Sequence, residues 1–383
     1  FDADGRNDLL LGSGGGDYFG EAPPLLDRLY RNSSSGLQQV PFPEYYANTS
    51  VIRPCDYDKD GDLDLFLGAQ SLTGRFGEIP ASHLLENTGG SFRAVDSFNG
   101  KSLGMITDAV WSDFDADGRK DLIVVGEWMS PRFFKNTTEG LKEIAFEGPS
   151  GLWQCISPYD IDGDGDTDYL LGNWGTNSKF VATAATPLKM YFSDFDSNGS
   201  TETVVATAKK GSYYTLVGLD DLGAQMVSLR KKYPNYKSFA GKPIEDIFGP
   251  EALQAARLYE ATELRSGYLK NEEGHFKYYP FPNTLQVAPV LTFLPYDFTG
   301  DGKTEVLAAG NYFGVKPYQG RLDAFPGALI LGESEILPGN RMGLDFMNKS
   351  IRHLSVIELN HEPFLLAVYN GDAAEVYQLM KNN

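Results

Sequence analysis

The stretch that decides the fold is Asp56-Tyr-Asp-Lys-Asp-Gly-Asp-Leu-Asp64, which leads at once into the apolar segment Leu65-Phe-Leu-Gly68. Acidic side chains alternate along it, and the glycine at its sixth position permits a sharp turn. The pattern returns in copies that begin at Asp113, Asp160, Asp194 and Asp297. A shortened copy with Asp2, Asp4, Gly5 and Asp8 opens the chain, and its first acidic position would fall just before Phe1. The sequence is therefore an internal repeat, and we expect the chain to begin downstream of a natural start.

A second element follows several of these copies: an apolar pair, an Asn, a polar turn with Gly, and a further apolar residue. It is found at residues 29–37, 84–92, 133–141 and 268–276. Asn and Gly both tolerate positive φ, so this element reads as a β-hairpin. One repeat therefore supplies four strands: a first strand, the acidic loop, a second strand and the hairpin. Four-stranded units of roughly 40–50 residues are typical of β-propeller blades.

The sequence thus predicts an all-β fold, a single β-propeller domain over residues 1–383. Six motifs and a C-terminal unit without one (residues 351–379) favour seven four-stranded blades, and the ends leave six or eight open. The long gap before Asp297 contains helix-like apolar spacing, which predicts a helical insertion over residues 220–266 within one blade. Two unrelated β-sandwiches are the alternative fold, but the regular recurrence leaves no linker between separate domains.

The acidic loops have the chemistry of a calcium site, with side-chain ligands at positions 1, 3, 5 and 9 and a backbone carbonyl at position 7. An EF-hand would need Glu at position 12, where these copies have Leu, Val or Ala. The flexible, carboxylate-rich loops favour calcium over magnesium, with up to five or six ions. Copies two, three and four should bind best, the fifth and sixth more weakly, and the first should be the poorest. The expected ligands are Asp2, Asp4, Asp8, Asp56, Asp58, Asp60, Asp62, Asp64, Asp113, Asp115, Asp117, Arg119, Asp121, Asp160, Asp162, Asp164, Asp166, Asp168, Asp194, Asp196, Asn198, Ser200, Glu202, Asp297, Thr299, Asp301, Lys303 and Glu305.

Composition supports this interpretation and excludes other classes of protein. The chain has 52 acidic and 33 basic residues, a net charge of −19, which argues against a nucleic-acid partner. Of those acids, 21 lie at loop ligand positions, so the acidity is concentrated in the loops. Apolar runs are too short to span a membrane. The two cysteines, Cys55 and Cys155, fall in first strands of non-neighbouring blades, and we expect two buried thiols and no bridge.

These loops resemble the FG-GAP/VCBS repeat family of calcium-loop β-propellers, known from integrin alpha subunits and from secreted bacterial proteins. The likeness runs over nearly the whole chain and is specific in the loops. It implies structural calcium ions and an extracellular, cell-surface or periplasmic location. Members of the family serve adhesion, ligand binding or, less often, polysaccharide cleavage.

The sequence therefore favours a binding or adhesion module with a glycan or protein ligand, and we expect a monomer. The alternative is a polysaccharide lyase or hydrolase, but none of the four histidines (His83, His275, His353 and His361) lies in a catalytic motif. A third candidate is docking through the basic, tyrosine-rich segment 230–237. Its plainer interpretation is a solvated helix end.

A ligand is expected where the second strands end, on the face opposite the acidic loops. An aromatic residue beside a polar one recurs there and could stack on a sugar or hold a peptide. The expected residues are Glu127, Trp128, Asn173, Trp174, Asn311 and Tyr312. The competing interpretation is that these rings pack between neighbouring blades.

Overall fold

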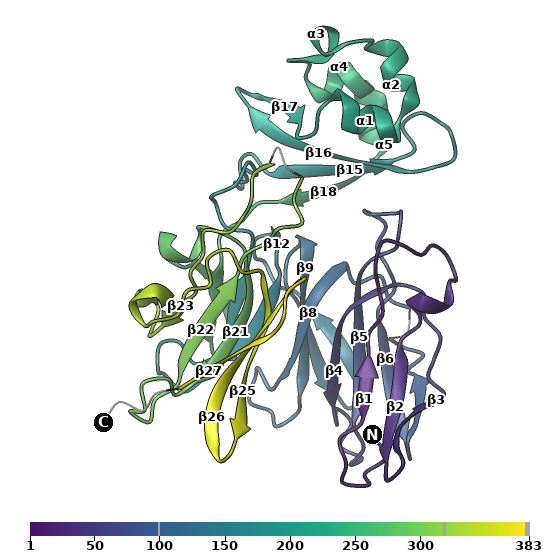
Figure 1. Cartoon of the computed structure of the whole chain (residues 1–383). Helices are drawn as coiled ribbons and strands as arrows, with labels where there is room; N and C mark the ends of the chain where they lie inside the picture. Colours follow the sequence, from purple (N-terminus) through teal and green to yellow (C-terminus); the bar gives the residue numbers. More distant parts are fainter. Residues whose placement is uncertain (99, 317–318, 380–383) are drawn as a thin grey trace.

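The computed structural model describes residues 1–98, 100–316 and 319–379, and it is all-β, with seven antiparallel sheets (Figure 1). Six sheets follow the expected repeat, in which chain order is also the order across the sheet. The first has three strands, β1 (Leu9–Leu11), β2 (Arg28–Ser33) and β3 (Gly36–Val40). The second has β4 (Asn48–Cys55), β5 (Asp64–Ser71), β6 (His83–Thr88) and β7 (Ser91–Ala94).

The third sheet repeats this plan with one addition. Its strands are β8 (Met105–Ser112), β9 (Asp121–Met129), β10 (Arg132–Thr137) and β11 (Gly140–Ile144), and the short β12 (Gly151–Leu152) also pairs with β9. Near the C-terminus a sheet of β21 (Val290–Tyr296), β22 (Glu305–Gly310), β23 (Ala328–Ile330) and β24 (Ile336–Pro338) precedes one of β25 (Ile351–Leu359), β26 (Glu362–Tyr369) and β27 (Glu375–Gln378).

The fourth sheet is divided by a long insertion. Its strands are β13 (Cys155–Tyr159) and β14 (Asp168–Gly172), then β19 (Gly267–Glu272) and β20 (His275–Pro280). The hairpin at residues 268–276 therefore completes the repeat that begins at Asp160, although almost a hundred residues separate them.

Between those halves lie a separate sheet and five helices, which stand above the other sheets in Figure 1. The sheet has the order β17 (Ser212–Thr215), β16 (Glu202–Lys209), β15 (Leu188–Ser193) and β18 (Arg257–Ala261). The helices join β17 to β18: α1 (Leu219–Gln225), α2 (Val227–Lys232), α3 (Tyr236–Phe239), α4 (Ile244–Phe248) and α5 (Pro250–Ala255). Their apolar faces share a core with β15 and β16.

The helices lie within the range where a helical insertion was expected, between β17 and β18 of one sheet. Helices do interrupt a sheet between Asp194 and Asp297, but that sheet is itself inserted into another repeat. The short spacing from Asp160 to Asp194 has the same cause. β14 is followed directly by the inserted sheet and not by its own hairpin.

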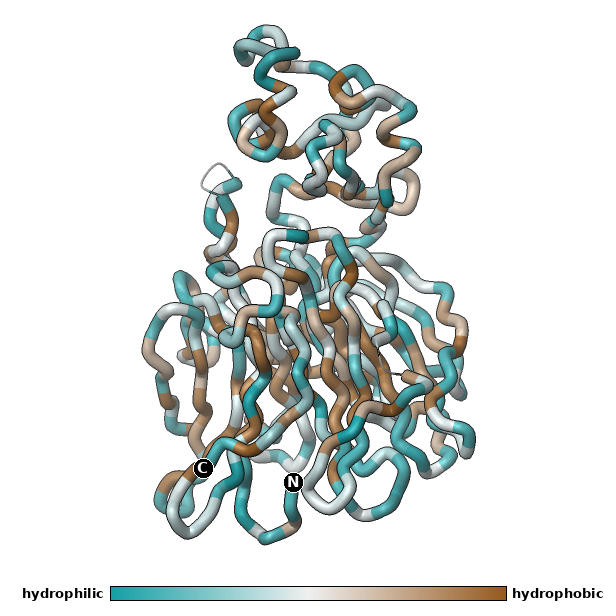
Figure 2. The backbone as a smooth tube through the Cα atoms, turned by 90° about the vertical axis from the view of Figure 1, so that its right-hand side faces the viewer, coloured by the Kyte–Doolittle hydropathy of each residue, from teal (hydrophilic) through white to brown (hydrophobic). Residues whose placement is uncertain are grey.

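Apolar clusters lie between successive sheets of the repeat, from the β1 sheet through to the β25 sheet. Their first strands contact one another in the order β4, β8, β13, β21 and β25. Figure 2 shows the apolar residues concentrated along the strands and many hydrophilic ones in the loops farthest from the helices. The first strands thus meet at the centre of the molecule.

Candidate cation loops and a central pocket

Five of the six acidic copies gather ligand atoms that lie within 4.8 Å of one another. Four of them use positions 1, 3 and 9, and the sixth copy uses positions 1, 5 and 9. The clusters are Asp56, Asp58 and Asp64; Asp113, Asp115 and Asp121; Asp160, Asp162 and Asp168; Asp194, Asp196 and Glu202; and Asp297, Asp301 and Glu305. All-oxygen sets of this kind suit a hard cation such as calcium.

The acid at position 9 is buried and closes each loop. In the third copy, Asp121 Oδ2 accepts from the Phe114 backbone N–H at 3.2 Å, and Oδ1 accepts from the Asn136 N–H at 2.7 Å. Asp64 and Asp168 make the same pair of bonds. Burial raises the pKa of Asp64, Asp121 and Asp168 to about 6, against the opposing effect of these bonds. Each of these side chains joins its loop to the hairpin of the same sheet.

The hairpin asparagines connect successive loops. Asn136 Nδ2 donates to the Tyr57 carbonyl of the preceding loop at 2.6 Å. Asn87 Nδ2 donates to the Phe1 carbonyl at 2.9 Å, and Asn271 Nδ2 to the Phe114 carbonyl at 3.2 Å. The accepting residue is at position 2 of the acidic copy each time. The first four loops therefore form a linked row.

Positions 5 and 7 serve mainly to shape the loop. The side-chain oxygen at position 5 accepts from the backbone N–H at position 7, as with Asp117 and Arg119 at 3.0 Å. The same bond is made by Asp60 and Asp62, Asp164 and Asp166, Asn198 and Ser200, and Asp301 and Lys303. Among these, only Asp301 belongs to a ligand cluster. Thr299 lies outside the cluster of the sixth copy, and its hydroxyl donates to Glu305 at 3.2 Å.

Cationic side chains partly neutralise some loops. Lys135 pairs with Asp115 and with Asp117, and Lys270 pairs with Asp162. At the same hairpin position the second copy has Glu86, which accepts a hydrogen bond from the Tyr57 hydroxyl at 2.9 Å. The second loop therefore gains no cation from this position.

Three carboxylate oxygens of the loops indicate whether a cation would fit there. Asp56 Oδ1, Asp166 Oδ1 and Asp196 Oδ1 are buried and have no hydrogen-bond partner among the described residues. A buried oxygen without a donor is costly, and a bound cation would satisfy it. The donor sets of the second, fourth and fifth copies therefore fit a hard cation.

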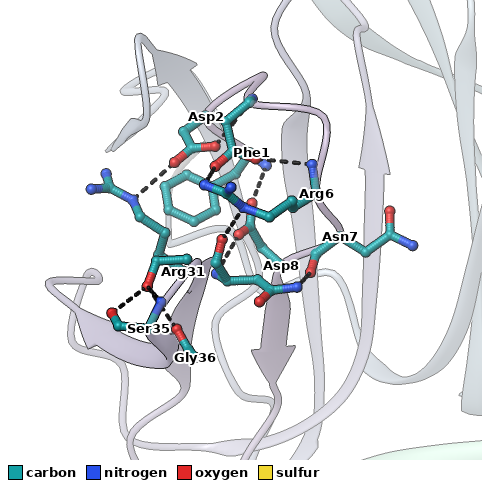
Figure 3. A network of polar contacts seen from close by, with 11 residues as sticks. Phe1, Asp2, Arg6, Asn7, Asp8, Arg31, Ser35 and Gly36 are labelled. Atoms are coloured by element: carbon teal, nitrogen blue, oxygen red, sulfur yellow. Dashed lines mark hydrogen bonds and ion pairs between the residues drawn. The ribbon is translucent and has the colours of Figure 1, made fainter.

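The first copy differs, as Figure 3 shows. Arg31 Nε contacts Asp2 Oδ2 at 2.8 Å, and Arg6 pairs with Asp4. Two of its carboxylates are thus already paired with arginines.

The fifth loop also lies apart from the others, contrary to the expectation that all loops share one face. Thr203, directly after it, donates to the Phe76 carbonyl, and Tyr259 of the same sheet donates to the Gly77 carbonyl at 2.6 Å. Phe76 and Gly77 follow β5, so they belong to the exit side of the second sheet. Because it belongs to the inserted sheet, the fifth copy lies at the strand end opposite the other acidic loops.

A central pocket of about 580 Å³ lies where the first strands meet. Five strands contribute to its wall (β4, β8, β13, β21 and β25), together with residues from four strand exits. Its polar and aromatic lining is Ser50, Arg53, Gln70, Thr107, Asp108, Glu127, Gln154, Trp174, Thr292, Phe293, Tyr312, Arg352 and His353.

β-Bulges shape this wall. In β4, β8, β21 and β25 the pairing with the second strand skips one residue near the start of the strand. The skipped residues are Ser50, Thr107, Leu291 and Arg352, and all four line the pocket. A bulge changes the direction of a side chain, so it places these residues at the centre. On the partner strand, a Cβ at Gly126 or Gly310 would lie within about 2.1 Å of a first-strand carbonyl.

The charged groups of the pocket have different partners. Arg53 pairs with Asp108, which also accepts from the Ile156 N–H at 3.0 Å. Glu127 is buried and accepts from Gln154 Nε2 at 3.0 Å. Burial raises the pKa of Glu127, and Gln154 opposes that shift. Trp174 and Tyr312 meet edge to face with ring centroids 5.2 Å apart.

Half of the expected ligand residues line this pocket. Glu127, Trp174 and Tyr312 do so, whereas Trp128 packs in an apolar cluster with the inserted sheet. Asn173 and Asn311 are fully buried and hydrogen-bond to backbone groups. These three residues support the pocket from behind, which for Trp128 agrees with the packing interpretation.

Several lining residues escaped the sequence analysis, namely Arg53, Asp108, Gln154 and Arg352. Most of them lie in first strands, whereas the predicted ligand residues all lie at second-strand exits. The available signal was a polar residue in an otherwise apolar first strand, such as Asp108 between Ile106 and Ala109.

Other candidate residues have structural partners. His83 stacks on Tyr45 with ring centroids 3.5 Å apart, and both cysteines are free thiols. In the basic segment, Lys232 donates to the Ile247 carbonyl at 2.8 Å and Tyr233 is buried in the helical core. This part of the segment therefore serves the packing of its own helices.

Comparison with known proteins identifies the repeat. A family model described as FG-GAP-like repeat matches residues 1–67 and 113–171, which include the first four acidic copies. These two segments are therefore similar to FG-GAP-like repeats. No curated protein matches the chain. Within the described residues, we find no helix with the length and apolar character needed to cross a bilayer.

Solved structures give distant similarities. One is the V. cholerae biofilm matrix protein Bap1, at 10% identity and a TM-score of 0.35, covering 92% of this chain and 75% of that chain. Another is BBS1N in complex with ARL6DN, at 11% identity and a TM-score of 0.35, covering 93% of this chain and 88% of that one.

Proposed function

We propose that the chain is a calcium-stabilised β-propeller of six blades that binds a glycan or protein ligand in its central pocket. The FG-GAP-like repeats support the propeller, and the six sheets of the repeat would be its blades. The inserted sheet and helices would form an appendage. Millimolar calcium outside the cytoplasm suits such loops, so we propose an extracellular, cell-surface or periplasmic location.

The acidic clusters support the calcium part of this proposal. They combine close carboxylates with buried oxygens that lack a donor. A bound ion would hold the turn between the first and second strands of its sheet. A site kept at 100 times its dissociation constant would stabilise the fold by about 2.7 kcal/mol.

The single observation that carries the binding function is the lining of the pocket. The first strands β4, β8, β21 and β25 place polar side chains there, with Gln154 directly before β13, beside the aromatic pair of Trp174 and Tyr312. A concave site with aromatic surface and a few convergent polar groups is the usual form of a ligand site. The indole Nε1 of Trp174 is buried and makes no direct hydrogen bond among the described residues.

A glycan-array and pull-down screen in calcium tests this function. We expect the variant Trp174→Ala/Tyr312→Ala to lose at least about tenfold in affinity for any ligand of the wild type, because buried aromatics dominate binding. The matched control is Tyr18→Ala/Phe19→Ala, which removes two exposed rings outside the pocket lining. Equal binding by a folded pocket variant and the control would place the ligand elsewhere.

A polysaccharide-active enzyme is the second candidate, and one observation favours it. Glu127 is a buried carboxyl with a raised pKa in a pocket that also contains Tyr312 and His353. Such a group can act as a general acid. Turnover of a bound polysaccharide, lost in Glu127→Gln, would establish this activity, and binding without turnover would exclude it for that ligand.

A further inference from the structure

The bulge positions of the first strands carry different side chains: two short hydroxyls, Leu291 in β21 and Arg352 in β25. At the bulge positions of β4 and β8, Ser50 Oγ donates to the Ile106 carbonyl at 2.6 Å and Thr107 Oγ1 to the Trp153 carbonyl at 2.8 Å. These short hydroxyl side chains tie one sheet to the next. At the same position of β25 the chain has Arg352, a long cationic side chain.

Arg352 has no structural partner of the usual kind. Its guanidinium lies over the Tyr312 ring, 5.1 Å from the centroid. Within the described part of the chain, it makes no ion pair and no hydrogen bond. A residue that breaks the local pattern without a structural gain is a candidate for function.

Arg352 is the cationic group of the lining that has no acidic partner among the described residues. The other arginine, Arg53, is neutralised by Asp108. Glu127 is fully sequestered beside Gln154, and burial favours its neutral form. A positive centre in a chain of net charge −19 favours an anionic ligand group.

We propose that the central pocket recognises an acidic sugar unit, with Arg352 binding its carboxylate and the ring packing against Trp174 and Tyr312. This proposal rests on the proposed binding function. Arg pairs with a carboxylate through two parallel N–H···O bonds, which fixes the orientation of the ligand. The amides of Gln70 and Gln154 lie in the same lining and suit sugar hydroxyls.

The pocket favours a sugar over an acidic peptide because of its shape and lining. A pocket of about 580 Å³ between five strands fits a compact unit or chain end. An extended peptide would instead need an exposed strand edge or an apolar groove. The first strands that form the wall are each paired on one side with their own second strand, and carbonyls at their inner edge are taken up by side chains of the neighbouring sheet, as where Ser50 donates to the Ile106 carbonyl.

The test is calorimetric titration of the whole chain, in calcium, with short uronate oligosaccharides and their methyl esters. Di- and trisaccharides of galacturonate, guluronate and glucuronate avoid calcium gelation, and the ester removes only the charge. We expect an acid to bind at least about tenfold more tightly than its ester, as for a charge-assisted bond. Arg352→Gln should bind the acid and the ester equally, and Arg341→Gln, on the exposed helix at 339–341, should match the wild type.

Three results would overturn the proposal. The first is equal affinity of the wild type for acid and ester, and the second is undiminished acid binding by folded Arg352→Gln. The third is binding of hexaglutamate, or of neutral glycans alone, without binding of any uronate. In that third case the binding module would stand and only its ligand class would be wrong. Failure of every probe, together with a negative screen, would remove both proposals.

Discussion

Glu127 brings a carboxyl group into the protein interior where β9 reaches the central pocket. Burial raises its pKa, so the folded protein holds a proton on it over a pH range in which the unfolded chain has released that proton. The stability that this proton confers is present below the ordinary glutamate pKa of 4.5 and is lost as the pH rises through the raised pKa. Each unit of that rise is worth about 1.4 kcal/mol.

We therefore expect Glu127→Gln to raise the melting temperature at pH 8 and to leave it nearly unchanged at pH 4. The uncharged amide keeps the shape of the side chain and removes the cost of the buried charge. Thermal melts of both proteins over this range measure the difference, and exposed Glu139→Gln is the control. A variant that is less stable than the wild type at pH 8 would show that the charged form is favoured in the fold.

At the same scale, the cation loops distinguish Asp162 from Thr299. Asp162 belongs to the cluster of the fourth copy, whereas Thr299 only donates to Glu305 in the sixth. In millimolar calcium, Asp162→Ala should therefore lose about 2–3 kcal/mol of stability, the contribution of one occupied site, and Thr299→Ala should lose less. Melts of both variants with calcium and with chelator decide the order. The reverse order would mean that the sixth loop is the stronger site.

At the scale of strands and hairpins, the hairpin asparagines connect neighbouring sheets in addition to forming turns. Asn136→Ala would leave the buried Tyr57 carbonyl without its bond and should cost about 1–3 kcal/mol. Asn32→Ala is the matched control, because Asn32 Nδ2 donates to Asn7 within its own repeat at an exposed site. Chemical denaturation in calcium measures both. Equal losses would mean that the link between loops adds nothing.

The elements also show what the sequence could and could not predict. Each acidic copy from Asp56 onward lies between two strands because its glycine turn and its apolar continuation are local features. The hairpins at residues 84–92 and 133–141 were predicted for the same reason. The pairing of β14 with β19 joins distant parts of the chain, so no local pattern reveals it. The copy at Asp160 and the hairpin at residues 268–276 were therefore assigned to separate blades. Bulges in the first strands also depend on tertiary contacts, which is why Arg352 went unnoticed.

Over the whole molecule, the pattern of charge divides into two parts. The carboxylates concentrate in the loops, while the centre holds Arg352 without an acidic partner among the described residues. The concentration of carboxylates in the loops could be predicted, because the alternating acids are visible in the sequence. The second part depends on which strands meet at the centre, and no local pattern indicates that.

The central claim is that calcium held by the acidic loops stabilises this fold. Differential scanning calorimetry of the whole chain in millimolar calcium, in magnesium and in chelator tests it most directly. One site at 100 times its dissociation constant adds about 2.7 kcal/mol, and a large domain gains about 2 °C per kcal/mol. We predict a midpoint at least about 5 °C higher in calcium than in chelator, with magnesium giving a smaller shift. Identical midpoints in calcium and in chelator would contradict the account.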